Sequence, residues 1–364
     1  MSDRQSIYYW KCDRASAFYA LQKSQSAYAG TELELPLYKV LSRFLGDDTF
    51  VFRPAGGQGN HLTYIVNHQH TDYFVRLENG PERDGYMAVE ARILDEVRAI
   101  GVPTPAVFYV DASRQQLPFA IQIMTHIRYS DLNSLNKKGS LNVCRIANEI
   151  GQAVARWQTL TPNGFGPFHA SILREEGKLV GLHATYADYF LLNLTRHLSF
   201  LSDHHFLTID EAKALSTIVE QHKHYLDLDL GCLVHKDLAL WNILGTPTTI
   251  EAFIDWDDCI VGDPTDDLSL LACFHDREFL TAALEGYEQI RPLPNDFWPR
   301  FWLHLLRNMI VKAVIRVGAG YFDRSDDFFL ISAGTTGQSL KTMTNERLWL
   351  AYRGLQNQAT LADL

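Results

Sequence analysis

The chain has 364 residues, which is long enough for two compact units or for one domain with two lobes. Apolar residues make up 46% of it and charged residues 21%, as in an ordinary soluble globular protein. Its net charge of −10 argues against a nucleic-acid partner, because no excess of basic side chains is available to neutralise phosphates.

The termini and the cysteines favour a cytoplasmic protein without a membrane partner. The first residues, MSDRQSIYYWKCDR, lack the apolar run of a signal peptide. The apolar stretch 301–317 carries His304, Arg307, Lys312 and Arg316, so we expect a buried or amphipathic helix there rather than a membrane span. The five cysteines are scattered and form no C-x-x-C pair, which argues against a disulfide framework or a zinc site and fits a reducing cytosol.

The first third of the chain predicts a helix followed by a β-rich region. Apolar residues recur at helical spacing at first, and then alternate with polar residues as in half-buried strands. Gly101 and the prolines after it mark the end of a second helix. The expected elements are a helix near 14–45, strands at 50–54, 61–67, 72–78, 106–110 and 118–124, and a helix at 87–100.

From about residue 140 the pattern is mainly helical. Ile146, Ile150, Val154 and Trp157 recur at helical spacing. A mainly β part followed by a mainly α part predicts an α+β fold with a cleft between two lobes. We place the N-lobe at 1–124 and the C-lobe at 125–364. The other helices are expected around 184–200, 209–225, 276–290 and 297–317.

Polar side chains at fixed spacing interrupt the apolar segment LVHKDLALWNIL. His235, Asp237 and Asn242 follow the pattern H-x-D-x-x-x-x-N, and Asp255 comes thirteen residues later at the end of a strand-like run. Phosphoryl transfer needs a carboxylate that orients the attacking hydroxyl and hard oxygen ligands for Mg²⁺. We therefore predict that Asp237 is the catalytic base or positions the acceptor hydroxyl, that Asn242 and Asp255 hold the metal, and that His235 supports the loop. A capped turn is the simpler alternative, because Asp and Asn are common in turns.

The segment PAGGQGNHLTYIV places a glycine-rich turn between two predicted strands. Backbone amides there can approach nucleotide phosphates closely, so we expect Gly57, Gln58 and Asn60 to contact the nucleotide. Met124 and Thr125, at the boundary between the lobes, are expected to complete the nucleotide site. An ordinary hairpin turn is the alternative for the glycines.

Arg76 lies on a predicted strand and Glu90 on the helix that follows it. A strand cation paired with a helix carboxylate holds the nucleotide phosphates in protein kinases. Order and spacing favour this role for Arg76 and Glu90 over an ordinary surface ion pair.

The stretch VHKDLALWNIL…FIDWDDCIVGDPTDDL resembles the aminoglycoside phosphotransferase family of kinase-like enzymes. The segments GGQGN, VRL around Arg76, EARIL around Glu90 and GVPTP (101–105) add to the resemblance, and TLTPNGFGPF (159–168) is similar to a segment of the hygromycin-type branch. The resemblance covers roughly residues 50–275. It implies a bilobal protein-kinase-like fold, ATP or GTP with Mg²⁺ as cofactors, and a small-molecule acceptor.

Four positions depart from the family pattern. Arg76 stands where protein kinases have lysine, although the planar fork of arginine also suits phosphate. Trp157 and Gln158 replace a common Leu-His pair. Lys236 replaces a small residue beside the base, and we expect it either to help neutralise the transferred phosphoryl group or to point into solvent.

Acidic residues are concentrated after Asp255. Asp257 and Asp258 are candidates to bind an ammonium group of the substrate, with a solvated acidic face as the alternative. Asp267 is expected to brace the catalytic loop and Asp263 to shape the turn before Pro264. Because Gly-Asp-Pro follows so soon and no Ala-Pro-Glu occurs, an activation segment does not fit and a peptide substrate is not expected.

These patterns predict a kinase that transfers phosphate to a hydroxyl of a small, cationic molecule. By resemblance, an aminoglycoside or a related antibiotic is the leading substrate, which implies a role in antibiotic resistance. Two alternatives stay open: a metabolite kinase for an amino alcohol, sugar or amino acid, and a catalytically silent nucleotide-binding protein.

Overall fold

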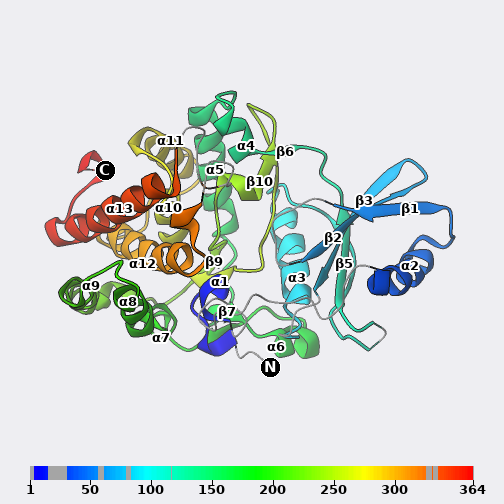
Figure 1. The fold of residues 1–364 in the computed structure, drawn as a ribbon, viewed down its shortest axis with the longest axis horizontal. Coiled ribbons are helices and arrows are strands. Elements are labelled where there is room, and N and C mark those ends of the chain that lie inside the picture. Colours follow the sequence, from blue (N-terminus) through cyan, green and yellow to red (C-terminus); the bar gives the residue numbers. More distant parts are fainter. Residues whose placement is uncertain are drawn as a thin grey trace.

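The computed structural model describes residues 4–14, 31–55, 61–78, 83–115, 117–324, 330 and 335–363. A β-sheet with its helices forms one end of the molecule and a larger, mainly helical part forms the other (Figure 1). This arrangement confirms the α+β, bilobal fold predicted from the sequence.

The N-terminal sheet has five antiparallel strands in the order β1-β2-β3-β5-β4. Alternating apolar residues of β2, β3 and β5 face a core that they share with α2 (Thr31–Leu45). In this register Arg76 lies beside Thr63 on one neighbour and Gln122 on the other. The strands are β1 (Phe50–Pro54), β2 (Leu62–His68), β3 (Thr71–Glu78), β4 (Val107–Asp111) and β5 (Ala120–Thr125).

The helix α3 (Tyr86–Ala99) lies between the sheet and the helical part (Figure 1). Its apolar residues belong to the larger core of the molecule rather than to the core under the sheet. Gly101 follows with φ = 82°, a left-handed conformation that favours glycine, as expected for the end of this helix.

The helical part is built around α5 (Val143–Trp157), α11 (Arg277–Glu288) and α12 (Phe297–Gly318). The helix α12 is buried over most of its length, and no helix of the described residues is long and apolar enough to cross a membrane. The other helices are α4 (Leu132–Lys137), α6 (Ala170–Glu176), α7 (Tyr186–Phe190), α8 (Leu194–Asp203), α9 (Ile209–Gln221), α10 (Asp266–Leu271) and α13 (Gly337–Asn357).

Two small sheets position the loops between the lobes. In one, β9 (Cys232–Val234) pairs with β12 (Ile260–Gly262), and the sheet order is β8-β7-β12-β9. In the other, the order is β11-β10-β6, so that β10 (Ile243–Gly245) pairs with β11 (Ile250–Phe253). The remaining strands of these two sheets are β6 (Ser130–Asp131), β7 (Phe165–Phe168) and β8 (Gly181–His183).

Several predicted elements differ in extent from the observed ones. The helix expected near 14–45 is found only over Thr31–Leu45, while residues 15–30 lie outside the described part of the chain. The single helix expected over 184–200 is two helices, because Asn193 has φ = 56° and interrupts the helical backbone between α7 and α8.

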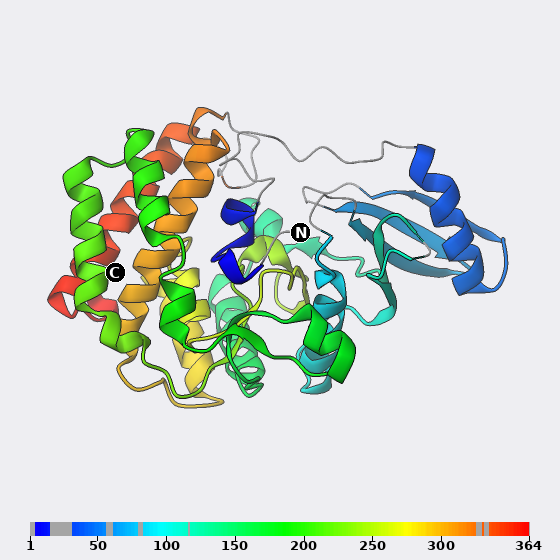
Figure 2. The ribbon, with the colours of Figure 1, turned by 90° about the horizontal axis from the view of Figure 1, so that it is seen from below.

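The N-terminal segment, residues 4–14, lies between the two parts of the molecule (Figure 2). It forms a short helix, α1 (Trp10–Asp13), which lies between the two parts against the helices (Figure 2). Tyr8, Tyr9 and Cys12 belong to the larger core. Arg4 pairs with Asp84 at 2.6 Å and lies over the ring of Tyr86, so residues 4–14 contact both parts of the molecule.

Candidate active site

The loop between β9 and β10 carries His235, Asp237 and Asn242. Asp267, in the first turn of α10, accepts hydrogen bonds from the backbone N–H of His235 at 2.9 Å and of Lys236 at 3.0 Å. The indole of Trp157 donates a third hydrogen bond to the same carboxylate at 3.0 Å. Asp267 thus makes the contacts expected of a brace for this loop.

His235 connects this loop with the segment that carries Asp255. Its Nε2 lies 3.1 Å from the carbonyl oxygen of Ile254, and its Nδ1 accepts the backbone N–H of Asp237 at 3.4 Å. The ring is fully buried, and burial lowers its pKa to about 4. A neutral imidazole in this position orients both loops and does not accept a proton at neutral pH.

Asp237 is buried, yet its carboxylate has an unusually large number of partners. The Oδ1 atom accepts the hydroxyl of Tyr9 at 2.7 Å and the ammonium of Lys312 at 3.2 Å. The Oδ2 atom accepts Nδ2 of Asn242 at 3.1 Å and pairs with the ammonium of Lys11. Burial opposes its ionisation, but Lys11 and Lys312 hold the pKa of Asp237 far below its ordinary value.

Asn242 and Asp255 lie on adjoining loops. The backbone N–H of Ile254 donates to the carbonyl of Asn242 at 3.0 Å, which places the next residue, Asp255, beside the loop that carries Asp237. Asp255 adopts φ = 65°, a left-handed conformation that is uncommon for a residue with a side chain. The Nδ2 of Asn242 makes both of its hydrogen bonds to Asp237. Its amide oxygen and the partly exposed Asp255 carboxylate are the donor types that Mg²⁺ prefers, so these residues fit the predicted metal.

The pair between Arg76 and Glu90 is buried, so the alternative of a surface ion pair is wrong. Arg76 Nη1 lies 2.6 Å from Glu90 Oε1, and the same oxygen accepts the backbone N–H of Trp256 at 3.2 Å. Arg76 Nη2 is 3.7 Å from Asp255 Oδ1. Burial opposes its charge, but Glu90 and Asp255 raise the pKa of Arg76. The pair therefore connects β3 and α3 with the Asp255 loop.

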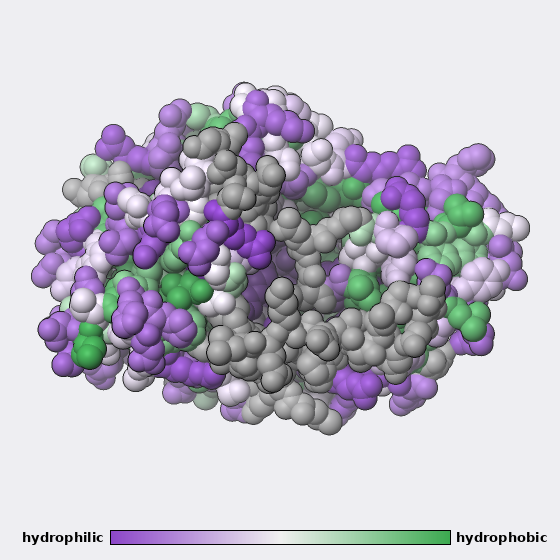
Figure 3. Space-filling view, viewed as in Figure 1, coloured by the Kyte–Doolittle hydropathy of each residue, from purple (hydrophilic) through white to green (hydrophobic). Residues whose placement is uncertain are grey.

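Of the remaining residues predicted to contact the nucleotide, some belong to the described part of the chain and others do not. Gly57, Gln58 and Asn60 lie outside the described residues. Met124 and Thr125 end β5, where the chain leaves the sheet, and the backbone N–H of Thr125 donates to Ala106 at 2.9 Å. Their contact with a nucleotide stays a prediction. Between the two parts, the surface has a hollow with hydrophilic residues at its visible floor (Figure 3).

Both expectations for Lys236 are wrong. Its ammonium lies 2.6 Å from Asp266 Oδ2, donates to the Tyr8 hydroxyl at 3.0 Å and lies 3.3 Å from Asn308 Oδ1. The residue is 2% exposed, so it reaches neither solvent nor the cleft. The cause is local, because φ = 68° at Lys236 turns the side chain toward the helical core, where Asp266 supplies the countercharge.

The acidic residues after Asp255 are not a uniformly solvated face. Asp258 is buried, its Oδ2 lies 3.6 Å from Lys11 Nζ, and burial raises its pKa to about 6. Asp257 is partly exposed, although its Oδ1 atom is buried. Asp263 accepts the backbone N–H of Thr265 at 2.7 Å and pairs with Arg300 at 2.7 Å, as expected for a residue that shapes the turn.

Three residues in the site were missed by the sequence-based analysis: Tyr9, Lys11 and Lys312. The two lysines were visible as cations within the otherwise apolar or aromatic segments YYWKC and MIVKAV. A charged side chain in such a segment needs a buried partner, and this is the signal that could have identified them. Their partner, Asp237, was not predictable from spacing because it is 226 residues from Lys11.

Residues 51–299 match the model of the phosphotransferase enzyme family. The fold is similar to that of APH(4)-Ia, an aminoglycoside phosphotransferase solved with AMP-PNP and hygromycin B, at 16% identity and a TM-score of 0.58, covering 86% of this chain and 98% of that one.

Two further solved structures are similar. The streptomycin–ATP–APH(2″)-IIa complex has 16% identity and a TM-score of 0.55, covering 90% of this chain and 99% of that one. A protein from Haemophilus somnus 129PT, provisionally named a fructosamine-3-kinase, has 13% identity and a TM-score of 0.57, covering 86% and 96%. At these identities the likeness shows the fold alone. No curated protein matches the sequence.

Proposed function

The chain belongs to the phosphotransferase enzyme family, a group of kinase-type enzymes, and we propose that it transfers the γ-phosphate of ATP to a hydroxyl of a small cationic molecule with Mg²⁺ as cofactor. GTP is the alternative donor. An aminoglycoside-like or related antibiotic is the leading acceptor, because two structures of similar fold hold hygromycin B and streptomycin.

One observation carries this proposal. Asp237 and Asn242 lie on one loop and Asp255 on another. The ammonium of Lys11 pairs with the Asp237 carboxylate and also lies 3.9 Å from the Asp255 carboxylate. The groups proposed to activate the acceptor and to hold the metal therefore converge within a few ångströms. That convergence is what in-line phosphoryl transfer needs, because the transfer depends mainly on positioning and charge stabilisation.

The chemistry follows from the polarity of these groups. Asp237 is proposed to accept the proton of the acceptor hydroxyl as its oxygen bonds to the γ-phosphorus and the bond to the β-phosphate oxygen breaks, so that ADP leaves with the electron pair. Bound by Asn242 and Asp255, Mg²⁺ would neutralise charge on the phosphates. Arg76, fixed by Glu90, would bind the phosphates through its planar fork.

A cationic acceptor is supported by the charge around Asp237. Asp255 and the buried Asp258 lie 3.9 Å and 3.6 Å from the Lys11 ammonium, and the negative charge of Asp257 also acts on it. These carboxylates already bind one ammonium group, that of Lys11, which supports the proposal that an amine on the substrate would be attracted to the same region.

A metabolite kinase is the second candidate, supported by the similar fold of the Haemophilus somnus protein. Both candidates use the same catalytic groups and differ only in the acceptor. The catalytically silent alternative is not favoured by the family match.

The test is Mg²⁺-dependent ADP release by the full-length protein, measured with a panel of hydroxylated acceptors. The panel pairs each cationic molecule, such as an aminoglycoside or an amino alcohol, with a neutral polyol of similar size. We expect turnover with at least one amine and little with its neutral partner. ATP binding without ADP release from any acceptor would contradict the proposed transfer, and preference for neutral polyols would contradict the cationic acceptor.

A further inference from the structure

The chain's own N-terminal segment contributes two side chains to the catalytic carboxylate. Tyr9 donates its hydroxyl to Asp237 Oδ1 at 2.7 Å, and Lys11 pairs with Oδ2. The Lys11 ammonium is also 3.6 Å from Asp258 Oδ2 and 3.9 Å from Asp255 Oδ2. A single cation thus lies between the proposed base and a proposed metal ligand, which is the space the transferred phosphoryl group must cross.

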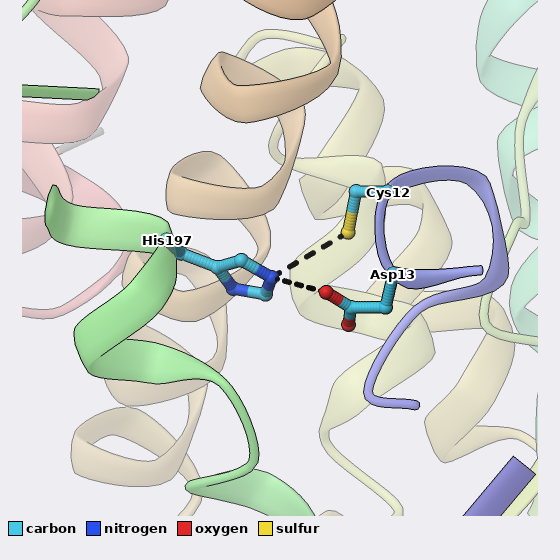
Figure 4. Close-up of side chains that lie close together, drawn as sticks. All are labelled: Cys12, Asp13 and His197. Atoms are coloured by element: carbon cyan, nitrogen blue, oxygen red, sulfur yellow. Dashed lines mark hydrogen bonds and ion pairs between the residues drawn. The ribbon is translucent and has the colours of Figure 1, made fainter. Parts of the chain in front are cut away.

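Buried polar contacts fix α1 to α8. His197 Nε2 lies 2.8 Å from Asp13 Oδ1 and 3.6 Å from Cys12 Sγ (Figure 4). Arg307 Nη1 donates to His197 Nδ1 at 2.9 Å, so Nε2 carries the ring proton and donates it to Asp13. Asp13 Oδ2 also accepts the backbone N–H of Tyr8 at 3.0 Å. Cys12, Asp13 and His197 could hold a metal by their type, but the guanidinium and the protonated Nε2 make the cluster an anchor instead.

Aromatic packing fixes the same segment to the helical core. The ring of Tyr8 stacks on Tyr189 with centroids 4.9 Å apart, and the Arg307 guanidinium lies 3.7 Å from the centroid of the Tyr8 ring as a cation–π pair. Tyr189 donates its hydroxyl to the Tyr8 carbonyl at 2.7 Å. Tyr8, Tyr9 and Cys12 are all buried in the larger core. If α1 were an inhibitory segment, it would have to leave the site and expose these buried groups in every turnover. The packing therefore favours a segment that stays in place during the reaction.

The other lysines near the base are not available to a phosphate. Lys236 of the catalytic loop is held by Asp266 beneath the loop. The side chain of Lys312 contacts Asp237 Oδ1 but is only 9% exposed, whereas that of Lys11 is 32% exposed. Among the described lysines in contact with Asp237, Lys11 is therefore the one that faces the opening.

We propose that Lys11 is a catalytic residue that the N-terminal helix supplies to the phosphoryl-transfer site. The inference rests on the proposed function. When the acceptor hydroxyl takes its place at Asp237, the Lys11 ammonium donates hydrogen bonds to the γ-phosphate oxygens and keeps all three of its protons. The acceptor proton goes to Asp237 and ADP leaves with the electron pair, as before. A preorganised cation at the point where charge moves stabilises the transition state more than the ground state.

The experiment compares full-length wild type with Lys11→Met, Lys11→Arg and the control Lys178→Met, whose lysine is exposed and pairs with Glu176 at 3.0 Å. Because the acceptor is unidentified, the probes are Mg·ATP hydrolysis with water as acceptor and the affinities for ATP and ADP by titration calorimetry. Circular dichroism and a thermal melt verify folding.

For Lys11→Met we expect ADP release to fall by about 10²-fold, as for loss of one preorganised donor. Affinity for ATP should fall more than affinity for ADP, since only ATP has the γ-phosphate. Lys11→Arg should restore part of the ADP release rate and part of the ATP affinity, and Lys178→Met should match wild type. If Lys11→Arg folds and Lys11→Met does not, the ratio of ATP affinity to ADP affinity is compared between Lys11→Arg and wild type. A lower ratio in Lys11→Arg supports the inference, since a guanidinium cannot reproduce the geometry of the ammonium.

Other outcomes overturn the inference. Faster ADP release by Lys11→Met would identify α1 as an inhibitory segment, and an unchanged rate with an unchanged ratio of ATP to ADP affinity would leave Lys11 a structural role. If wild type binds ATP but hydrolyses none, the affinity ratio alone decides for or against Lys11. If wild type binds neither nucleotide, the proposed function itself fails, and that result is distinct from a failure confined to the Lys11 variants.

Discussion

Asp237 remains charged in a buried position because two other elements and its own loop bring donors to it. Tyr9 and Lys11 come from the N-terminal segment and Lys312 from α12, while Asn242 comes from the same loop. A buried carboxylate is stable only when such partners offset its lost hydration. The same partners lower its pKa, so Asp237 is a weak base in the free protein. In the proposed reaction it becomes a stronger base when Lys11 pairs with the phosphate instead.

Replacing Asp237 by Asn tests its role as the base. Asp237→Asn keeps the shape of the side chain but cannot accept the proton, so we expect turnover to fall by about 10²- to 10⁴-fold. The affinity for Mg·ATP, measured by calorimetry, should change by less than about threefold, because Asn242 and Asp255 are intact. Turnover equal to wild type would remove Asp237 from this role.

His235 predicts a dependence of stability on pH. Its folded-state pKa is about 4, below the ordinary value of 6.5, because the buried imidazole cannot easily become charged. The unfolded chain therefore binds more protons between pH 6.5 and 4, and the free energy of unfolding falls as the pH is lowered through this window. The loss should be on the order of 3 kcal/mol at pH 4.

The check is urea unfolding of wild type and His235→Gln between pH 7 and 4. Glutamine can still donate to the Ile254 carbonyl through Nε2 but does not titrate in this window. We expect the slope of unfolding free energy against pH to be smaller in His235→Gln. Equal slopes would mean that other groups cause the acid sensitivity.

At the scale of elements, α5 and α11 approach each other through glycines on both helices. A Cβ at Gly151 would lie 1.8 Å from the carbonyl oxygen of Ala283, and one at Gly286 would lie 2.0 Å from that of Asn148. No side chain fits at these distances, so the backbones of the two helices pack in direct contact. Trp157 at the end of α5 then reaches Asp267, which braces the catalytic loop.

Gly151→Ala should therefore destabilise the protein although alanine has the higher helix propensity. The added methyl group forces α5 and α11 apart, at an expected cost of about 1 to 3 kcal/mol or more. Denaturant unfolding measures this, with Ser216→Ala on the exposed side of α9 as the control for a helical substitution without a clash. A Gly151→Ala variant as stable as wild type would show that the helices can separate without loss.

The elements that the sequence predicted well are those with long, regular patterns. The strands β1 to β5 and the helices α3, α5, α11 and α12 follow from alternation or helical spacing, which depend only on neighbours in the chain. The break at Asn193 did not follow, since Asn193 has a left-handed backbone and donates to the carbonyl of Ser6 at 2.8 Å, a contact across 187 positions that local spacing does not indicate. The short helix α1 is stabilised by contacts with His197 and Tyr189, more than 180 residues away, and not by its own propensity.

At the scale of the whole molecule, the two parts are connected through the proposed nucleotide site. Glu90 of α3 binds Arg76 of the sheet and the backbone of Trp256 beside Asp255. The motif around Asp237 and Asn242 was predictable because it is local, and Asp255 lies close enough in sequence to follow it. The contributions of Lys11 and Lys312 required the folded chain, since nothing in local spacing indicates which carboxylate a distant lysine will meet.

This connection predicts that nucleotide binding stabilises the whole molecule and that the effect requires Asp255. A ligand at 100 times its dissociation constant adds about 2.7 kcal/mol to the free energy of unfolding, which corresponds to a rise of several degrees in the melting temperature. We expect Mg·ATP to produce this rise in wild type, and ATP with EDTA to produce a smaller one. In Asp255→Ala the difference between the two should disappear, because a carboxylate ligand for the metal is lost. The exposed control Asp229→Ala should behave as wild type. A full Mg²⁺-dependent shift in Asp255→Ala would exclude Asp255 as a metal ligand. The metal would then not be bound by the segment that connects the two lobes.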